Sequence, residues 1–369
     1  MRAKRNSPPD FLLFLSVMML LSIGLIMVFS SSYYFAMDPP FNDKFYFFQK
    51  QLISAVLGFG ALLFFMNFNY RQLKGYVNLI LGSAFLFLVL VMFIGDEYLG
   101  SQRWLTLGPI PSFQPSEMAK ICIIIYTAYG LSLKREQIRD FFQGIGPYLL
   151  ISGFAAGLIL MQPDLGTAAT LMGTVTVMFF AAGARIRDLG LLGLAGAGAV
   201  VVAIYFAPYR MRRFLAFLDP ESDPTGAGWQ ILNSLMALGS GMLVGTGLGQ
   251  GKHSKLLYLP ERHTDFIFAS IGEELGFIGG SVVILLFIMF IWRGFKIAVT
   301  APDAFGSLLA AGLVCGIALQ AVINIGVVTS SLPITGITLP LVSYGGTSLV
   351  FTMAGVGIIL NISRYSMRR

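Results

Sequence analysis

Charged residues are scarce in this chain of 369 residues, since Asp, Glu, Lys and Arg make up 12% of it and hydrophobic residues 56%. A soluble domain of this length has no core large enough to bury so much apolar surface. The mean hydropathy is +0.77, and uncharged stretches such as 11–30 and 77–94 have the roughly 20 residues needed to cross a bilayer. The composition therefore predicts a polytopic membrane protein.

Cysteine and histidine are also scarce, with two of each. Cys122 and Cys315 both fall inside predicted membrane spans, which excludes a disulfide framework and a zinc site. His253 and His263 are too few for a histidine-based metal centre. The stretch "GLGQGK" at 247–252 lacks the Ser or Thr of a phosphate-binding loop and is predicted to face outward, so ATP-driven transport is disfavoured. The net charge of +7 fits loops that face anionic lipid rather than nucleic acid.

Apolar runs between charged or turn-rich breaks predict ten transmembrane helices in one domain over 1–369. Basic residues gather in alternate loops, on the side of both termini, and the positive-inside rule assigns that side, with a tail at 1–10, to the cytoplasm. The predicted fold is an all-α polytopic membrane protein. We place its helices at 11–31, 50–68, 76–94, 117–133, 145–161, 166–183, 189–207, 274–292, 306–328 and 347–363.

The longest loop, 208–273, lies between the seventh and eighth predicted helices on the outer side. Ile231, Leu235 and Leu238 are spaced as on one helix face and are followed by glycines, which predicts an interfacial amphipathic helix and then a flexible turn. Long loops translocate largely regardless of charge, so its basic residues are compatible with this topology. An anionic ligand at the membrane surface would account for them.

Several ionisable residues lie in or beside predicted spans, where they are costly unless paired or wet. Glu117 and Lys120 are three apart and could form an ion pair, either structural or functional. Asp164 could cap the sixth span, and Glu273 with Glu274 could favour the N-terminus of the eighth. These alternatives stay open on the residues alone.

Two outer loops add further polar groups. Arg103 beside Trp104 suits either an interfacial aromatic belt or a phosphate and sugar site. The stretch "TGITLPLVSYGGTS", which contains Ser343 and Tyr344, could form a re-entrant segment that lines a cavity. Because the unusual polar clusters share the outer face, two classes remain: an enzyme acting on an anionic lipid-linked substrate, or a flippase that moves such a lipid. A non-catalytic scaffold is a third reading.

The motifs together resemble the SEDS family (shape, elongation, division, sporulation), in order from about residue 10 to the C-terminus. The resemblance is strongest to the SpoVE and FtsW branch and more distant to RodA. The loop containing "LPERHTDFIFA" is its most specific part. The motifs are "GSQRWL", "QPSEMAK", "QPDLGTA", "APYRMRR", "LPERHTDFIFASIGEELGFIGG" and "TGITLPLVSYGGTS".

The resemblance implies a peptidoglycan glycosyltransferase with ten transmembrane helices in a bacterial cytoplasmic membrane, used in cell division or sporulation. It implies polymerisation of lipid II, the undecaprenyl-pyrophosphate-linked disaccharide, at the outer face. The implied partners are a class B penicillin-binding protein, which is a transpeptidase, and other division or sporulation proteins, with no nucleic acid. The aspartate required for activity falls on Asp265. Arg262 departs from many relatives and is expected to add positive charge beside the site.

Inverting transfer from a pyrophosphate donor needs a base and stabilisation of the leaving group. We expect Asp265 to be that base, or to hold a divalent cation, Mg or Mn, with no nucleotide or organic cofactor. The plain cytoplasmic loops and the lack of an evident internal repeat favour an enzyme over a flippase. The expected substrate-binding residues are Arg103, Trp104, Glu117, Lys120, Asp164, Arg210, His263, Thr264, Ser343 and Tyr344.

Overall fold

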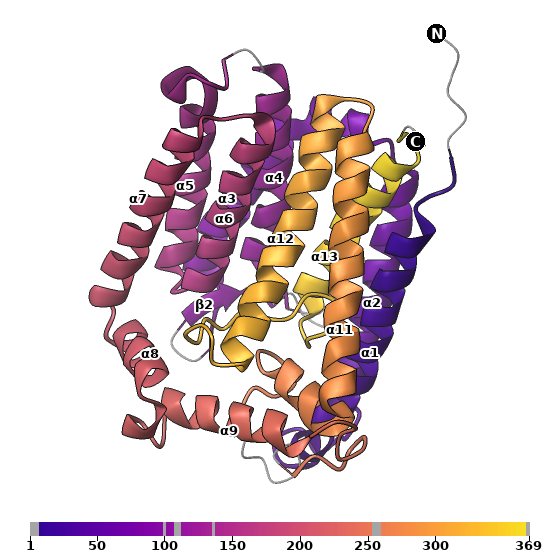
Figure 1. Ribbon diagram of the computed structural model, residues 1–369, viewed down its shortest axis with the longest axis vertical. Coiled ribbons are helices and arrows are strands. Elements are labelled where there is room, and N and C mark those ends of the chain that lie inside the picture. The colour runs from indigo at the N-terminus through magenta and orange to yellow at the C-terminus, as the bar shows by residue number, and fades with distance from the viewer. Residues whose placement is uncertain (1–6, 99–100, 107–111, 135–136, 253–259, 367–369) are drawn as a thin grey trace.

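The computed structural model describes residues 7–98, 101–106, 112–134, 137–252 and 260–366, so the basic residues at 2–5 and 368–369 lie outside the described residues. Within those ranges, ten long helices form a bundle (Figure 1). They are α1 (Phe11–Met37), α2 (Tyr46–Asn67), α3 (Leu73–Ile94), α4 (Pro115–Leu133), α5 (Gly146–Met161), α6 (Leu165–Ala182), α7 (Ile186–Tyr205), α11 (Ile267–Thr300), α12 (Ala304–Val328) and α13 (Gly346–Ser363).

The predicted class of an all-α polytopic membrane protein is confirmed. In the described ranges, nine helices are long and apolar enough to cross a membrane. The remaining long helix, α4, carries Glu117 and Lys120 near its start and packs against α3 and α12 within the bundle. It is therefore placed by its neighbours although it is less apolar than they are.

Helices α12 and α13 form the centre of the bundle, and α7 lies at its edge. About two thirds of the apolar window of α12 and 78% of that of α13 are buried, against 6% for α7. Helix α13 packs along α2, where a Cβ on Gly357 would lie 2.6 Å from the carbonyl oxygen of Leu62. Small residues thus let the two backbones approach, as is common between helices in lipid.

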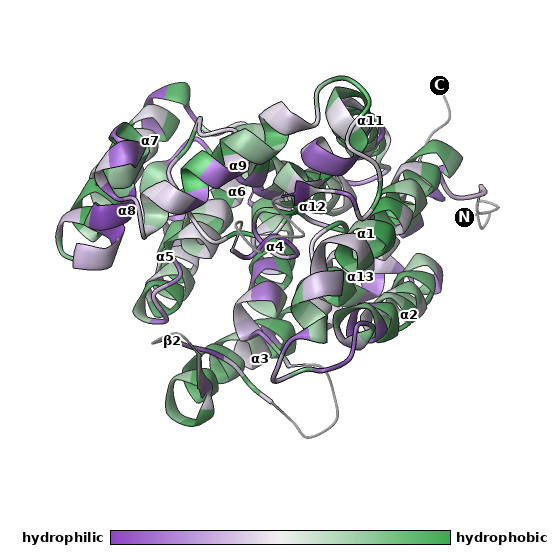
Figure 2. Cartoon of the chain, turned by 90° about the horizontal axis from the view of Figure 1, so that it is seen from below, coloured by the Kyte–Doolittle hydropathy of each residue, from purple (hydrophilic) through white to green (hydrophobic). Residues whose placement is uncertain are grey.

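Short elements cover one end of the bundle. They are the antiparallel pair β1 (Asp96–Tyr98) and β2 (Ser101–Trp104), helix α8 (Pro208–Leu218), the 3₁₀ turn η3 (Pro220–Ser222) and helix α9 (Ala227–Ser240). We call this end, which also contains the turn 260–266, the site end. The described chain begins at Ser7 and ends at Ser366, both at the opposite end (Figure 1). Viewed from the site end, α1 and α2 are largely hydrophobic and α8 carries hydrophilic residues (Figure 2).

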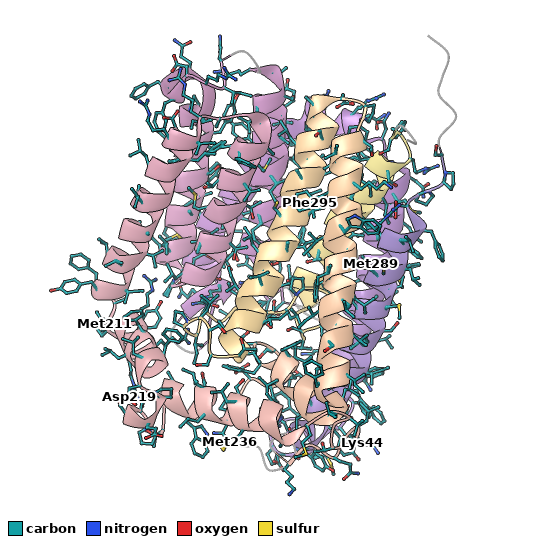
Figure 3. The ribbon with its side chains drawn as sticks, in the orientation of Figure 1. Lys44, Met211, Asp219, Met236, Met289 and Phe295 are labelled. Carbon is teal, nitrogen blue, oxygen red and sulfur yellow. The ribbon has the colours of Figure 1, made fainter. Side chains whose placement is uncertain are left out.

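The loop 208–273 contains more structure than one amphipathic helix. In α9, Ile231 is buried but Leu235 is exposed, so the predicted apolar stripe does not face one uniform surface. Met211 on α8 and Met236 on α9 lie along the site end (Figure 3). The segment 253–259, which includes His253, lies outside the described residues.

The predicted role of Glu273 and Glu274 at a helix N-terminus is wrong. Helix α11 begins at Ile267, and both carboxylates lie buried inside its first part. Glu274 accepts hydrogen bonds from the Ser30 hydroxyl and from the Gly249 N–H, at 3.0 Å for the latter. The helix is broken two residues later at Gly276, where φ is +66°. The acids therefore belong to a short buried segment that precedes the main helix.

Candidate functional site

Asp265 lies in a tight turn, residues 260–266, immediately before α11. The turn is closed by the Phe266 N–H, which donates to the carbonyl oxygen of Glu261 at 3.1 Å. Glu261 adopts a left-handed φ of +50°, and its carboxylate accepts a hydrogen bond from the Thr264 hydroxyl at 2.6 Å. Thr264 therefore orders the turn through Glu261, next to Asp265.

Asn324 fixes the backbone of Asp265 from the neighbouring helix α12. Its side-chain amide donates to the carbonyl oxygens of Asp265 and Ile337, both at 2.7 Å. Asn324 is buried, and one turn earlier on α12 Gln320 donates to the carbonyl oxygen of Thr338 at 3.1 Å. Two amides on one helix face thus join the aspartate turn to the segment 335–338.

Gly336 lies beside both the Asp265 carboxylate and the Arg213 guanidinium. A Cβ at this position would lie 3.6 Å from Asp265 Oδ2 and 4.0 Å from Arg213 Nη1. The φ of +74° also favours glycine. Both charged groups are therefore within van der Waals reach of this position, where glycine adds no side chain.

The surroundings of Asp265 raise the pKa of its carboxyl to about 7. Burial among protein atoms is the largest cause, followed by the negative charge of Glu261; Asp164 adds to the rise, while Arg213 and Arg103 oppose it. Part of the Asp265 surface nevertheless remains accessible. A carboxyl that is half-buried and titrates near neutral pH is suited to accept a proton.

Arg103 and Asp164 lie next to one another at the junction of β2 and α6. Arg103 Nε donates to the carbonyl oxygen of Gln162 at 2.7 Å, and its Nη2 donates to that of Pro163. Asp164 caps α6 by accepting from the Thr167 N–H at 2.9 Å, so the capping alternative is observed. Both charges act on Asp265, as their effect on its pKa shows. Trp104 is half-buried on β2, and its predicted sugar contact stays a prediction.

Glu117 and Lys120 form the expected ion pair, with 2.8 Å between Lys120 Nζ and Glu117 Oε1. Lys120 also donates to Gln320 Oε1 at 2.8 Å. Because Gln320 binds Thr338, this pair is connected to the same segment that carries Gly336. The lysine is held by two acceptors rather than left free in solvent.

The segment 339–345 is bonded directly to the aspartate turn. The Ser343 hydroxyl donates to the carbonyl oxygen of Thr264 at 2.7 Å, and the Tyr344 N–H donates to that of His263 at 2.8 Å. Burial raises the pKa of the Tyr344 hydroxyl to about 12. Ser343 and Tyr344 are therefore part of the site, through contacts that support the turn.

His263 is enclosed by aromatic side chains. Its ring centroid lies 4.5 Å from that of Phe47, 5.7 Å from that of Phe35 and 5.6 Å from that of Tyr344. Burial, with a smaller effect of Arg262, lowers the pKa of the imidazole to about 3, so it is neutral. This placement favours a packing role over contact with a substrate.

Arg262 does not add charge beside the carboxylate as expected. Its Nε donates to the carbonyl oxygen of Ser31 in α1 at 2.7 Å, and its guanidinium lies over the Phe35 ring. The side chain is buried, and burial lowers the pKa of Arg262 to about 10. Arg262 therefore attaches the turn to α1.

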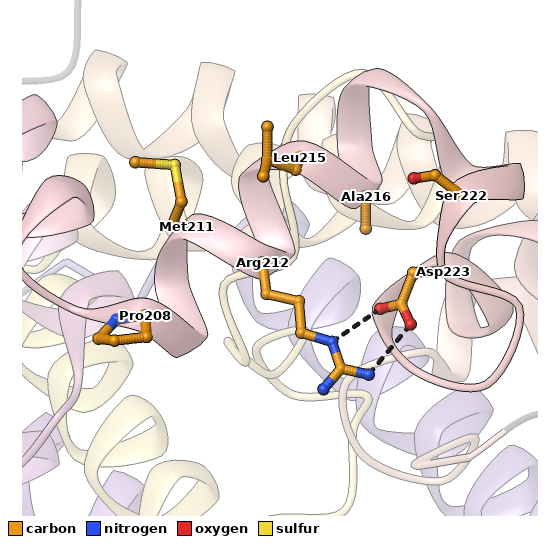
Figure 4. Close-up of a pocket in the computed structure, with 7 residues that line it drawn as sticks. All are labelled: Pro208, Met211, Arg212, Leu215, Ala216, Ser222 and Asp223. Atoms are coloured by element: carbon orange, nitrogen blue, oxygen red, sulfur yellow. Dashed lines mark hydrogen bonds and ion pairs between the residues drawn. The ribbon is translucent and has the colours of Figure 1, made fainter.

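The arginine that faces Asp265 is Arg213 rather than Arg210. Arg210 donates to the carbonyl oxygen of Ala203 at 3.1 Å and to the Tyr209 hydroxyl at 2.7 Å, which disfavours its predicted role. Arg212 is paired with Asp223 in a pocket of about 410 Å³ on α8 (Figure 4). Arg210 and Arg213 both lie over the Tyr209 ring. Of the three α8 arginines, only Arg213 contributes to the pKa of Asp265.

The donor set around Asp265 does not form a metal site by itself. Among the described residues, no three His, Cys, Asp or Glu side chains are grouped so that they could hold an ion. A magnesium-like ion commonly takes one or two carboxylates and completes its shell with water and substrate phosphates. Asp265 could therefore hold a cation only together with water and the phosphate oxygens of a substrate.

Comparison with known proteins gives one consistent picture. The family model described as "cell cycle protein" matches residues 10–368. Stage V sporulation protein E of Bacillus subtilis is 47% identical over 99% of this chain and all of its own. The probable peptidoglycan glycosyltransferase FtsW of Geobacter sp. (strain M18) is 42% identical over 96% of both chains.

Two solved structures have the same fold. A chain from a peptidoglycan synthase complex that coordinates polymerization and crosslinking superposes with a TM-score of 0.79 at 30% identity, over 96% of this chain and 98% of its own. The rod shape determining protein RodA of Thermus thermophilus superposes with a TM-score of 0.72 at 28% identity, over 98% of both chains.

Proposed function

Because the chain belongs to the FtsW/RodA/SpoVE family of cell cycle proteins, we propose that it is a peptidoglycan glycosyltransferase that polymerises lipid II. The observation that carries this proposal is the Asp265 carboxylate, which has a pKa of about 7 and lies beside Gly336, close to the Arg213 guanidinium. An acid poised near neutral pH beside a cation suits proton removal coupled to departure of an anionic group. The names of the relatives support the same reaction class.

In the proposed reaction, the 4-hydroxyl oxygen of the acceptor sugar attacks the anomeric carbon of the donor. The bond from that carbon to the pyrophosphate oxygen breaks, and the anomeric configuration inverts in this single displacement. The hydroxyl proton passes to Asp265. The electron pair of the broken bond leaves with the lipid pyrophosphate, which needs little protonation.

Basic side chains at the site end would stabilise the departing pyrophosphate. Arg213 is the best placed, because its guanidinium lies near the same glycine as the carboxylate and has the largest effect of any cation on the pKa of Asp265. Lys120 is oriented by Glu117, and Arg103 acts on the same carboxylate from β2. Planar guanidinium groups suit phosphate oxygens, which accept paired hydrogen bonds.

The alternative to a general base is that Asp265 would hold a divalent cation, Mg or Mn, near the pyrophosphate. When bound, it would supply charge neutralisation at the phosphate oxygens. The residues would hold it through one Asp265 oxygen, while Arg213 and Lys120 bind the remaining phosphate oxygens. Removal of the cation with a chelator should then abolish polymerisation without changing the thermal stability of the protein.

We further propose that the reaction takes place at the outer face of a bacterial cytoplasmic membrane, with a class B penicillin-binding protein as the cross-linking partner. The start of α1 and the end of α13 lie at the end opposite the site, which supports a cytoplasmic position for that end (Figure 1). The similarity to a chain from a peptidoglycan synthase complex supports a partner of that kind.

Purified protein incubated with lipid II in detergent tests the proposal. A detergent micelle has no two leaflets, so lipid transfer by a flippase cannot take place in it. A polymerase, by contrast, can make glycan strands in detergent. Strand formation that requires Asp265 supports the enzyme. Failure to form strands with partner and cation present, together with lipid II transfer across vesicles, would establish the flippase instead.

A further inference from the structure

Helix α11 is broken, and the loop 241–247 closes the break. At Gly276 the helix leaves helical geometry, which frees backbone groups on both sides. The loop replaces their partners with four backbone hydrogen bonds, two on each side of Gly276. These run from Phe277 N to Met242 O (2.8 Å), Ile278 N to Leu243 O (3.1 Å), Thr246 N to Glu273 O (2.9 Å) and Gly247 N to Glu274 O (3.0 Å).

Glycines bring the loop and the break into backbone contact. A Cβ on Gly241 would lie 1.8 Å from the carbonyl oxygen of Gly272, and one on Gly245 would lie 2.2 Å from that of Glu274. A Cβ on Gly276 would lie 2.3 Å from the Gly245 nitrogen. No side chain fits at these three positions, so the loop is held against the helix at a fixed place.

The loop presents three consecutive apolar side chains outward: Met242, Leu243 and Val244, here called the hydrophobic tip. They are 80%, 67% and 75% exposed. The tip is next to Phe277 and Ile278, which are also largely exposed and begin the outward face of α11. Because exposed apolar surface costs about 25 cal/mol per Å² in water, three such residues in a row at a fixed position require a covering medium.

The length of α11 shows which medium reaches the tip. Residues 267–274 are all buried in the protein, so the membrane-crossing part begins after Gly276. From Phe277 to Thr300 it is about 36 Å long at 1.5 Å per residue, slightly more than the roughly 30 Å hydrocarbon core. Phe277 and Ile278 therefore lie at the edge of that core, and the hydrogen-bonded tip lies at the same level.

We propose that the hydrophobic tip inserts into the acyl chains of the leaflet at the site end of the bundle. Its surface continues the lipid-facing side of α11, which includes the exposed Leu285 and Ile288 further along the helix. The inserted tip fixes the level of the segment 267–275, and so of Asp265, relative to the bilayer. The proposal rests on the fold and not on the proposed enzymatic function.

Spin labels on the full chain in lipid nanodiscs test the insertion. Cys122 and Cys315 are both buried, and they are replaced by alanine so that Leu243→Cys or Val244→Cys carries the only label. The ratio of collisions with oxygen to collisions with a water-soluble nickel chelate is measured for each. Leu285→Cys is the lipid-facing control, and Glu221→Cys, exposed on η3, is the aqueous control.

We expect the ratio at both tip positions to be several-fold above that at Glu221→Cys and to approach that at Leu285→Cys. A tip ratio equal to the aqueous control would overturn the proposal. Low collision rates with both reagents would overturn it too, because they indicate cover by protein, such as a second copy of the chain. Two labelled positions are used so that a folding defect in one variant leaves the other to decide.

Discussion

Asp265 at the site end and two carboxylates at the opposite end of the helix bundle use their charge in different ways. At the end of the termini, Arg293 is paired with Asp10, and Arg71 is paired with Asp303 at 3.1 Å. Asp10 and Asp303 also cap α1 and α12, so both carboxylates stabilise the helix bundle. At the site end, no cation within 4 Å pairs with Asp265 in the described part of the chain, although Arg213 lies close enough to lower its pKa.

Asp10 and Asp303 stabilise the fold, whereas the Asp265 carboxylate remains available to react with a substrate. A paired, capped carboxylate has its oxygens satisfied and its ionised form favoured. Asp265 has a pKa of about 7 and no paired cation among the described residues, an arrangement that costs stability and is typical of reactive positions. Substitutions at the two ends should therefore divide into losses of activity and losses of stability.

The largest effect is expected for Asp265→Asn. The amide keeps the shape of the side chain and leaves the Asn324 bond to the Asp265 carbonyl oxygen in place, but it cannot take a proton. Loss of a general base costs about 10²- to 10⁴-fold in rate. Glycan-strand formation from lipid II should fall by that factor while thermal stability in detergent is kept. Near-normal synthesis by folded Asp265→Asn would remove Asp265 from the chemistry.

A smaller but clear loss is expected for Asn324→Leu, which keeps the volume and removes the two donors to Asp265 and Ile337. A shift of about 1 Å in a reacting group can cost on the order of 100-fold, so we expect kcat to fall by about 10- to 100-fold with little change in KM. The matched control is Ser234→Ala, which removes a buried hydrogen bond to the Val328 carbonyl oxygen on the same helix.

Asn324 is thus predicted to be a positioning residue and not merely a structural one. If Asn324→Leu and Ser234→Ala lower the melting temperature equally but only the former lowers kcat per folded molecule, positioning is supported. Equal kcat for the two variants would show that the amide serves stability alone.

Much of the fold could be predicted from the sequence because membrane spans are set by hydropathy, which is local. The position of the break could not be predicted, since "GEELGFIGG" has four glycines and glycine also occurs inside membrane helices, so the pattern does not single out Gly276. The partner of that break, the loop 241–247, is distant in the chain. Its hydrogen bonds with α11 depend on tertiary packing, which no single-sequence pattern reports.

The site was partly predictable for the same reason. Asp265 stood out in the sequence as a carboxylate next to a run of apolar residues. The choice between Arg210 and Arg213 could not be made, because it depends on how α8 is rotated and the sequence "YRMRRF" places arginines on several sides of the helix. Asn324 and Gln320 did carry a signal. They are two amides four residues apart in an apolar span, where polar side chains usually find a specific partner.

The pH dependence of the reaction tests the effect of the neighbouring charges on the pKa of Asp265, and we expect smaller changes here than for Asp265→Asn. Activity requires the ionised carboxylate, so it should rise about tenfold per pH unit below a pKa of about 7 and level off above it. Glu261→Gln removes a negative charge that raises this pKa and should move the rising limb to lower pH. Arg213→Gln removes a positive charge that lowers the pKa and should move the limb to higher pH. Shifts in the same direction would contradict the assignment.

The smallest effect on activity is expected at the opposite end, for Asp10→Asn. Asparagine remains a good helix cap, so the variant loses the charge paired with Arg293 while keeping an acceptor for the Leu13 N–H. A charge-assisted hydrogen bond of this kind contributes about 1.5–3 kcal/mol, so the melting temperature in detergent should fall. Polymerisation per folded molecule should stay within about twofold of the parent, because the group acts on packing and not on charge at the site. Asp10→Ala also loses the helix cap, so its free energy of unfolding should be about 1 kcal/mol below that of Asp10→Asn. If Asp10→Asn lowered kcat and left the melting temperature unchanged, the proposed difference between the two ends would be wrong. Such a result would mean that Asp10 affects Asp265 from the opposite end of the bundle.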